Sequence, residues 1–161
     1  MENIMYEISE YQMQELAKAA CSHYGFSLQF IPNDFKTTEL CELACMQNGG
    51  ALKWVPDELK SYLLCKFSCE TNGYALEYVP ENKKTYEICL AACRQTGFAL
   101  EFVPESSMTY ELCLEACRKN GYALCWVPKS MRTKKICKAA IKNDRNALQF
   151  VPKKMRKYMV G

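Results

Sequence analysis

The chain has 161 residues, of which 49% are hydrophobic and 24% are charged, a composition typical of one folded unit with an apolar core. No segment approaches the roughly 18 apolar residues of a membrane-spanning helix, and the first residues lack the basic and apolar regions of a secretory signal, so a membrane role and export are not predicted. The formal net charge of +3 hides an asymmetry: residues 1–116 carry 17 acidic and 8 basic side chains, whereas residues 117–161 carry 13 basic side chains and one acidic one, Asp144.

Read from its start, the chain is built from a repeat of 24 residues. A Val-Pro or Ile-Pro step marks each copy, with an aromatic residue just before it and a leucine two residues before that aromatic. A period of roughly 20 to 50 residues is typical of solenoids, in which stacked copies share one core that a single copy could not bury. We therefore predict an all-α solenoid, a single domain of six two-helix copies near residues 13–36, 37–60, 61–84, 85–108, 109–132 and 133–156.

The fifth copy shows how each copy is expected to fold. Thr109 is suited to cap a helix whose core stripe lies at helical spacing, and Gly121 is suited to end it in the left-handed C′ conformation. Pro128 prevents one uninterrupted helix, so we expect a short second helix or helical turn before it. A leucine-rich horseshoe with a strand at "ALEYV" is the alternative, but its L-x-x-L-x-L pattern is absent. The predicted stripe is Leu112, Cys113, Ala116 and Cys117.

Carboxylates recur near the predicted helix starts, at Glu15, Glu39, Glu87 and Glu111. Paired carboxylates can perform acid–base catalysis, but a negative charge in the first turn of a helix is already explained by the helix dipole. The sequence has no Ser-His-Asp set and no glycine-rich phosphate loop, and its single histidine, His23, lies on a polar flank. We therefore predict a protein that is not an enzyme and needs no cofactor.

Copies two and three break the pattern with apolar residues on the side of the helix away from the predicted core. Leu63 stands where other copies have glutamate, and Phe67 follows one turn later. One interpretation is a contact site ringed by acidic residues, and the other is extra packing against a neighbouring copy. The candidate protein-binding residues are Leu43, Met46, Leu63, Phe67, Glu39, Glu87 and Glu111, with Glu70 also on the rim.

Eleven cysteines without an export signal predict reduced thiols and a cytoplasmic location, in the producing cell or in a host. Pairs at i, i+4 could offer thiolates to a soft metal, but buried cysteine also serves as a small hydrophobic residue, and we favour core packing without a metal. Cys125 lies outside the two cysteine columns, in an otherwise polar one. It is therefore expected to be more exposed, either as an incidental surface thiol or as a thiol with a lowered pKa. The pairs are Cys41/Cys45, Cys65/Cys69, Cys89/Cys93 and Cys113/Cys117.

The basic end could bind phosphates with salt-dependent affinity, or an acidic protein surface, or the acidic front of a second copy of this chain in a head-to-tail contact. It could also be only a solvated end copy. The candidate basic patch is Arg118, Lys119, Arg132, Lys134, Lys135, Lys138, Lys142 and Arg145.

The recurring "ELC", "NG-x-AL" and "VP" at fixed offsets resemble a repeat family of bacterial and viral proteins catalogued as a domain of unknown function, number four-one-one-six. The likeness covers nearly the whole chain from Met13, but Cys45, Cys69, Cys93 and Cys117 stand where the family usually has valine. The resemblance implies a helical repeat array, transfers no catalytic residue, and implies contacts with other proteins, since members often sit in large bacterial surface, effector or phage-related proteins.

Together these features predict a non-enzymatic protein-binding scaffold that acts through its exposed helix faces, as an inhibitor or adaptor of a host or viral system. The alternative is nucleic-acid binding through the basic C-terminal copies.

Overall fold

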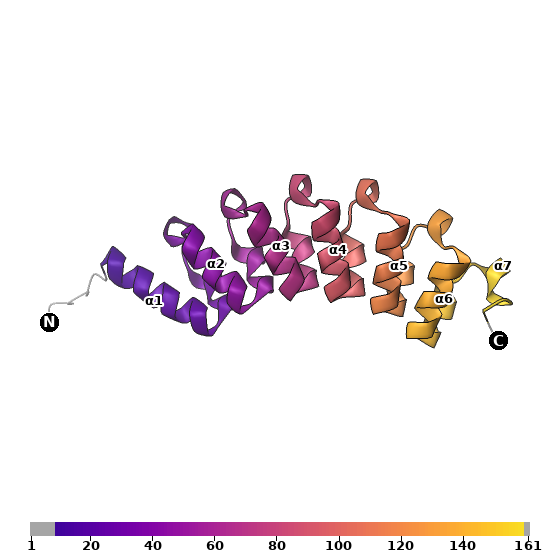
Figure 1. The fold of residues 1–161 in the computed structure, drawn as a ribbon. Coiled ribbons are helices and arrows are strands. Elements are labelled where there is room, and N and C mark those ends of the chain that lie inside the picture. Colours follow the sequence, from indigo (N-terminus) through magenta and orange to yellow (C-terminus); the bar gives the residue numbers. More distant parts are fainter. Residues whose placement is uncertain (1–8, 160–161) are drawn as a thin grey trace.

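The computed structural model describes residues 9–159, which form a single curved row of helices with α1 at one end and α7 at the other (Figure 1). Within this range the structure contains helices and no strand, so the predicted all-α solenoid is confirmed and the horseshoe alternative is excluded. The α-helices are α1 (Glu10–His23), α2 (Thr38–Gln47), α3 (Tyr62–Thr71), α4 (Tyr86–Gln95), α5 (Tyr110–Lys119), α6 (Lys134–Asn143) and the short α7 (Lys153–Arg156).

The predicted second helix of each copy is a 3-10 helix, and in the first five copies a shorter 3-10 turn follows the Val-Pro or Ile-Pro step. In the sixth copy the short α7 takes the place of this second turn. The longer segments are η1 (Gly25–Phe30), η3 (Gly49–Trp54), η5 (Gly73–Tyr78), η7 (Gly97–Phe102), η9 (Gly121–Cys125) and η11 (Arg145–Phe150). The shorter ones are η2 (Asn33–Phe35), η4 (Asp57–Leu59), η6 (Glu81–Lys83), η8 (Glu105–Ser107) and η10 (Lys129–Met131).

A serine or threonine sets the start of each of the six long α-helices. Thr109 accepts a hydrogen bond from the backbone N–H of Leu112, as predicted, and such a cap stabilises a helix by about 1 kcal/mol. The first helix begins earlier than the first predicted copy, because Ser9 forms a capping box with Gln12 and adds a turn before Met13. The N-caps are Ser9, Thr37, Ser61, Thr85, Thr109 and Thr133.

The glycine column has a different role from the one predicted. No described glycine has a positive φ, so Gly121 does not supply a left-handed C′ residue. Instead each glycine lies against the helix of the next copy: a Cβ built on Gly97 would lie 2.3 Å from the carbonyl oxygen of Ala116, and one on Gly25 would lie 2.3 Å from that of Ala44. Glycine is required at these positions because the backbone carbonyl oxygen of the next copy's helix occupies the space that a Cβ would fill.

The core runs continuously through the row. The predicted stripe of the fifth copy is completely buried, with Leu112, Cys113, Ala116 and Cys117 all at 0% exposure. The leucine column from Leu28 to Leu124 is buried in the same way, whereas Leu148 in the last copy is only partly buried. The helices contact mainly those of the neighbouring copies, and small Ala and Cys side chains permit this close stacking.

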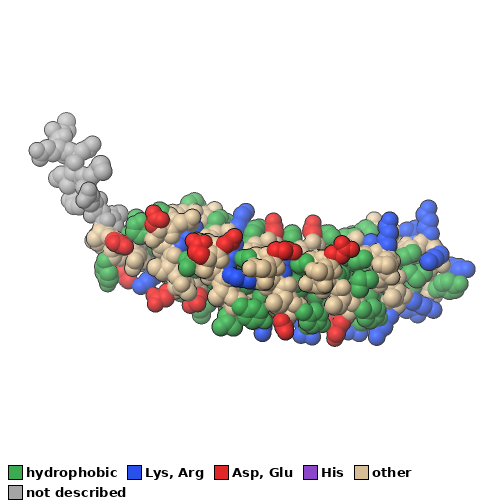
Figure 2. Space-filling model, turned by 90° about the horizontal axis from the view of Figure 1, so that it is seen from above, with side chains coloured by type: hydrophobic (Ala, Val, Ile, Leu, Met, Phe, Trp, Pro, Cys, Tyr) green, Lys and Arg blue, Asp and Glu red, His purple; other side chains and the backbone are tan. Residues whose placement is uncertain are grey.

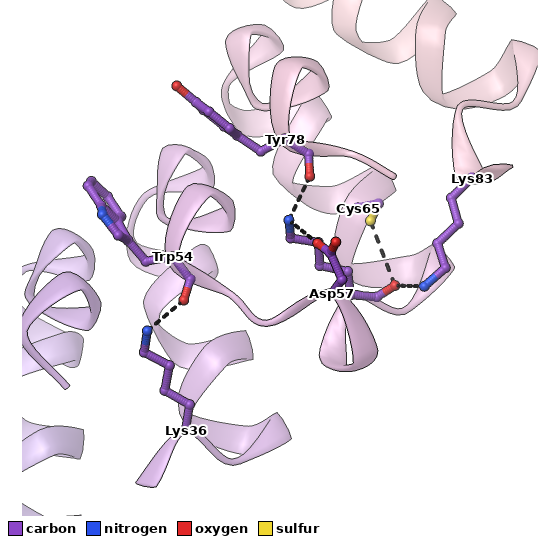
Figure 3. A network of polar contacts seen from close by, with 7 residues as sticks. Lys36, Trp54, Asp57, Cys65, Tyr78 and Lys83 are labelled. Carbon is purple, nitrogen blue, oxygen red and sulfur yellow. Dashed lines mark hydrogen bonds and ion pairs between the residues drawn. The ribbon is translucent and has the colours of Figure 1, made fainter. Parts of the chain in front are cut away.

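A ladder of cations ties most copies to the next, and Figure 3 shows part of it. The Nζ of Lys36 donates a hydrogen bond of 2.8 Å to the carbonyl oxygen of Trp54, and the Nζ of Lys60 donates one of 2.8 Å to that of Tyr78. At further joints the same bond is made by Lys84 to Phe102 and by Arg132 to Phe150.

Candidate protein-binding surface

Two grooves open between successive α-helices in the acidic half of the row. The first, of about 330 Å³, lies between α2 and α3 and is lined by Glu42, Met46, Leu63, Leu64 and Phe67. Met46 is 67% exposed, Leu63 is 74% exposed and Phe67 is 38% exposed. We call these five residues the apolar groove. A side chain packed against a neighbouring copy would not be three-quarters exposed, so the exposure of Leu63 favours the contact-site interpretation over the packing one.

The sequence places these side chains on one face because two caps fix the phase of two helices. Thr37 and Ser61 occupy the same position in successive copies and cap α2 and α3 identically, through the backbone N–H groups of Leu40 and Leu64. The helices therefore start in register, and residues one turn apart on each line the space between them. The buried stripes of both helices face inward, which leaves Met46 and Phe67 on the outer side.

The remaining residues of the predicted binding set lie outside the apolar groove. Leu43 is half-buried on α2 and does not line it, and Glu39 is exposed at the start of the same helix. Glu87 lines a second groove of about 440 Å³ between α3 and α4. Glu111, one copy further on, accepts a hydrogen bond from the hydroxyl of Tyr86. The second groove also contains Lys66, Glu70, Leu90, Ala91, Arg94 and Gln95.

The carboxylate ladder is also less regular than predicted. Glu39, Glu87 and Glu111 do lie in the first turns of α2, α4 and α5. Glu15 does not, because α1 begins at Glu10 and Glu15 is already in its second turn, where its side chain pairs with Lys18 at 3.3 Å. The helix dipole therefore explains three of these four carboxylates.

The thiols of the two cysteine columns are buried, as the packing interpretation predicts. Burial raises the pKa of Cys41 and of Cys45 to about 11 and that of Cys69 to about 12, while the pKa of Cys93 is raised further still. Such thiols are protonated at neutral pH and are poor nucleophiles and metal ligands. Among residues 9–159, no cluster of three or more His, Cys, Asp or Glu side chains is placed to hold a metal ion.

Cys125 is less exposed than its polar column predicted, and the alternative of a thiol with a lowered pKa is wrong. Its side chain is half-buried, and burial raises its pKa more than the nearby guanidinium of Arg132 lowers it. This guanidinium is held in place by the copy itself, because it donates hydrogen bonds to the carbonyl oxygens of Cys125, Val127 and Phe150. Arg132 is therefore a structural residue of the ladder and not, as predicted, part of a free basic patch.

The other basic residues remain on the surface. Figure 2 shows basic side chains crowded at the C-terminal end of this face, with acidic ones along the rest of the row. Arg118 pairs with Glu115 at 2.5 Å, so its charge is partly compensated. The remaining members of the predicted patch are all exposed: Lys119, Lys134, Lys135, Lys138, Lys142 and Arg145.

Sequence reasoning missed the cation ladder, although the signal was present. A basic residue recurs at 24-residue spacing just before the helix cap, and it is absent only at Met108 among the copies that have a following neighbour. At that joint η9 ends early, at Cys125, and Trp126 adopts a helical conformation instead of continuing the 3-10 segment. The missing rung of the ladder thus coincides with the shortened η9.

The chain is a helical-repeat protein. Its copies stand in a row and share one core, repeated hydrogen bonds join them, and grooves open between their helices. No helix among residues 9–159 is long and apolar enough to cross a membrane. The family model described as Domain of unknown function (DUF4116) matches residues 14–60, 63–107 and 109–156, so the chain belongs to this family, and the predicted resemblance is confirmed. A comparison with curated proteins finds no match, and neither does one with solved structures.

Proposed function

We propose that this chain is a non-enzymatic scaffold that binds another protein through the outer faces of α2, α3 and α4. The observation that carries the proposal is the apolar groove, where the exposed side chains of Met46, Leu63 and Phe67 line one continuous hollow between α2 and α3. Contiguous exposed apolar side chains with a polar rim are typical of interaction sites, and large apolar side chains that fill pockets dominate binding energy.

The second groove extends the surface across α3. Its lining includes Leu90 and Ala91 together with the charged side chains of Lys66, Glu70, Glu87 and Arg94. The two grooves lie on either side of one helix, so a single partner segment laid across α3 would contact both. Binding of this kind would cover a surface of the partner or link the partner to another molecule, without changing it chemically. Those are the actions of an inhibitor and of an adaptor.

A capture experiment from the native host, read by mass spectrometry, tests the proposal. Wild type is compared with Leu63→Glu, and Leu16→Glu is the matched control, because Leu16 is a leucine of 57% exposure on α1, away from both grooves. We expect one protein to be captured by wild type and by Leu16→Glu but lost with Leu63→Glu, while far-UV circular dichroism shows all three folded. A partner retained by folded Leu63→Glu would contradict the proposal.

The alternative is nucleic-acid binding through α6, where Lys134, Lys135, Lys138 and Lys142 are exposed on one helix. Phosphate contacts would make the affinity fall steeply with salt. A titration of the protein with generic DNA and RNA at low salt decides this point, since no binding under those conditions eliminates the alternative.

A further inference from the structure

The C-terminal end of the row carries an exposed aromatic side chain flanked by two cations. Tyr158 is 58% exposed, and its ring lies under the Nζ of Lys134 at 5.6 Å from the centroid and beside the Nζ of Lys157 at 4.9 Å. Lys134 begins α6, and Tyr158 follows α7, so two separate elements hold this arrangement together. We call Tyr158, Lys134 and Lys157 the basic anchor.

The apolar groove has the complementary chemistry. Its walls include the exposed side chains of Met46, Leu63 and Phe67, and its charged lining residue is Glu42. An apolar groove that carries the carboxylate of Glu42 matches an aromatic ring with an ammonium group on either side. The halves of the chain are biased in the same direction, because residues 1–116 have a net charge of −9 and residues 117–161 one of +12, both counted from the sequence.

The two features cannot meet within one molecule. α2 and α3 lie toward the N-terminal end of the row and α7 lies at its C-terminal end, with three helices between them (Figure 1). If the anchor fills an apolar groove of this kind, that groove must belong to another molecule.

End-to-end stacking in the register of the repeat is blocked. At the internal joints a glycine admits the carbonyl oxygen of the next helix, and a Cβ there would lie within 2.5 Å of that oxygen, for example on Gly73 against Ala92. The sixth copy has Arg145 in the glycine column. A second molecule therefore cannot extend the stack from this end, and a contact between molecules must be lateral, through side-chain surfaces.

We propose that the basic anchor of one molecule docks in the apolar groove of a second copy of this chain, with Tyr158 against Leu63 and Phe67 and with Lys157 near Glu42. Each molecule carries one anchor and one groove, so the contact is heterologous and leaves a free site at each end of any assembly. The chain therefore forms open head-to-tail oligomers whose length rises with concentration and falls with salt, since the pairing of surface charges is screened.

Sedimentation velocity of the full-length chain over a wide concentration range, at low and at high salt, tests the proposal. We expect the sedimentation coefficient of wild type to rise with concentration at low salt and to rise less at high salt. Leu63→Glu blocks the groove, Tyr158→Ser removes the anchor, and each should weaken association at least about tenfold, the loss expected when a central interface side chain is removed. Wild type that stays monomeric throughout overturns the proposal.

Mixing the two variants gives the decisive readout. Leu63→Glu keeps its anchor and Tyr158→Ser keeps its groove. An equimolar mixture should therefore form a dimer of one of each and nothing larger, at concentrations where each variant alone stays monomeric because its self-association is weakened. A mixture that stays monomeric, or a folded Leu63→Glu that associates as wild type does, overturns the proposal. The pair Glu42→Lys and Lys157→Glu adds a charge test, because each alone should weaken association and the mixture should restore it. None of these readouts depends on capture of a host protein, so they fail or succeed separately from the proposed function.

Discussion

Replacement of Lys60 by methionine should remove one rung of the cation ladder and little else. Lys60 is 6% exposed, and its Nζ donates hydrogen bonds of 2.8 Å to the carbonyl oxygen of Tyr78 and of 2.8 Å to Oδ1 of Asp57. Methionine keeps an unbranched apolar stem in the same space, and Met108 occupies the equivalent position in the fourth copy. The main loss is therefore the charged hydrogen bond between copies.

The magnitude follows from that bond. A hydrogen bond to a charged group contributes about 1.5–3 kcal/mol, and removing its donor also leaves the Tyr78 carbonyl oxygen without this partner. We expect the free energy of unfolding to fall by about 2 kcal/mol and the midpoint of thermal unfolding by about 4–8 °C, given about 2–4 °C for each kcal/mol in a chain of this size.

Urea and thermal unfolding followed by circular dichroism measure both quantities. Lys119→Met is the matched control, because Lys119 is exposed at the end of α5 and its side chain makes no hydrogen bond or ion pair within residues 9–159. The control should change stability by less than about 0.5 kcal/mol, as surface substitutions usually do. A Lys60→Met protein as stable as the control would refute the view that the ladder holds the copies together.

Three further predictions use the same unfolding measurements. Met108→Lys should raise the free energy of unfolding by about 1 kcal/mol, by supplying the missing bond to the carbonyl oxygen of Trp126, and no gain would mean that the irregular η9 has another cause. Gly97→Ala should lower the free energy of unfolding by about 2 kcal/mol or more, because its Cβ would lie 2.3 Å from the backbone oxygen of Ala116. Gly50→Ala should lower it less, because the Cβ there meets side-chain atoms first, at 3.0 Å. Equal losses of stability in the two variants would argue against the close-approach explanation. Alkaline pH should destabilise the fold, because burial raises the pKa of many thiols to about 11 or 12, so the folded state keeps protons that the unfolded state, with thiol pKa values near 8.5, releases. The free energy of unfolding should be constant below about pH 8 and should fall between about pH 9 and 12. An unchanged midpoint of unfolding in that range would contradict the burial of the thiols.

The sequence was sufficient for those features that depend on spacing along one copy. Helix caps such as Thr109 and the buried stripe from Leu112 to Cys117 follow from local chemistry and helical periodicity, which the six copies repeat without insertion. The exposed position of Leu63 followed in the same way, from its departure from a glutamate column.

Features that depend on the distance between copies could not be predicted in this way. The glycine column has the same sequence signature whether it supplies a positive φ or a close approach, and only the position of the next helix distinguishes them. Arg132 was assigned to the surface patch because the sequence does not show that the carbonyl oxygen of Phe150, in the following copy, lies close enough to accept its hydrogen bond. Cys125 stands in an otherwise polar column, but it is half-buried, and its carbonyl oxygen accepts a hydrogen bond from the guanidinium of Arg132.

The glycine column also constrains how such a gene can lengthen or shorten. Every internal joint has the same close backbone approach, so recombination between two glycine-bearing copies would add or delete a unit and keep that approach at every joint. A unit placed after the one that carries Arg145 would find no room for its helix. Whole units of 24 residues can therefore be added or deleted between glycine-bearing copies without a steric clash, but not directly after Arg145.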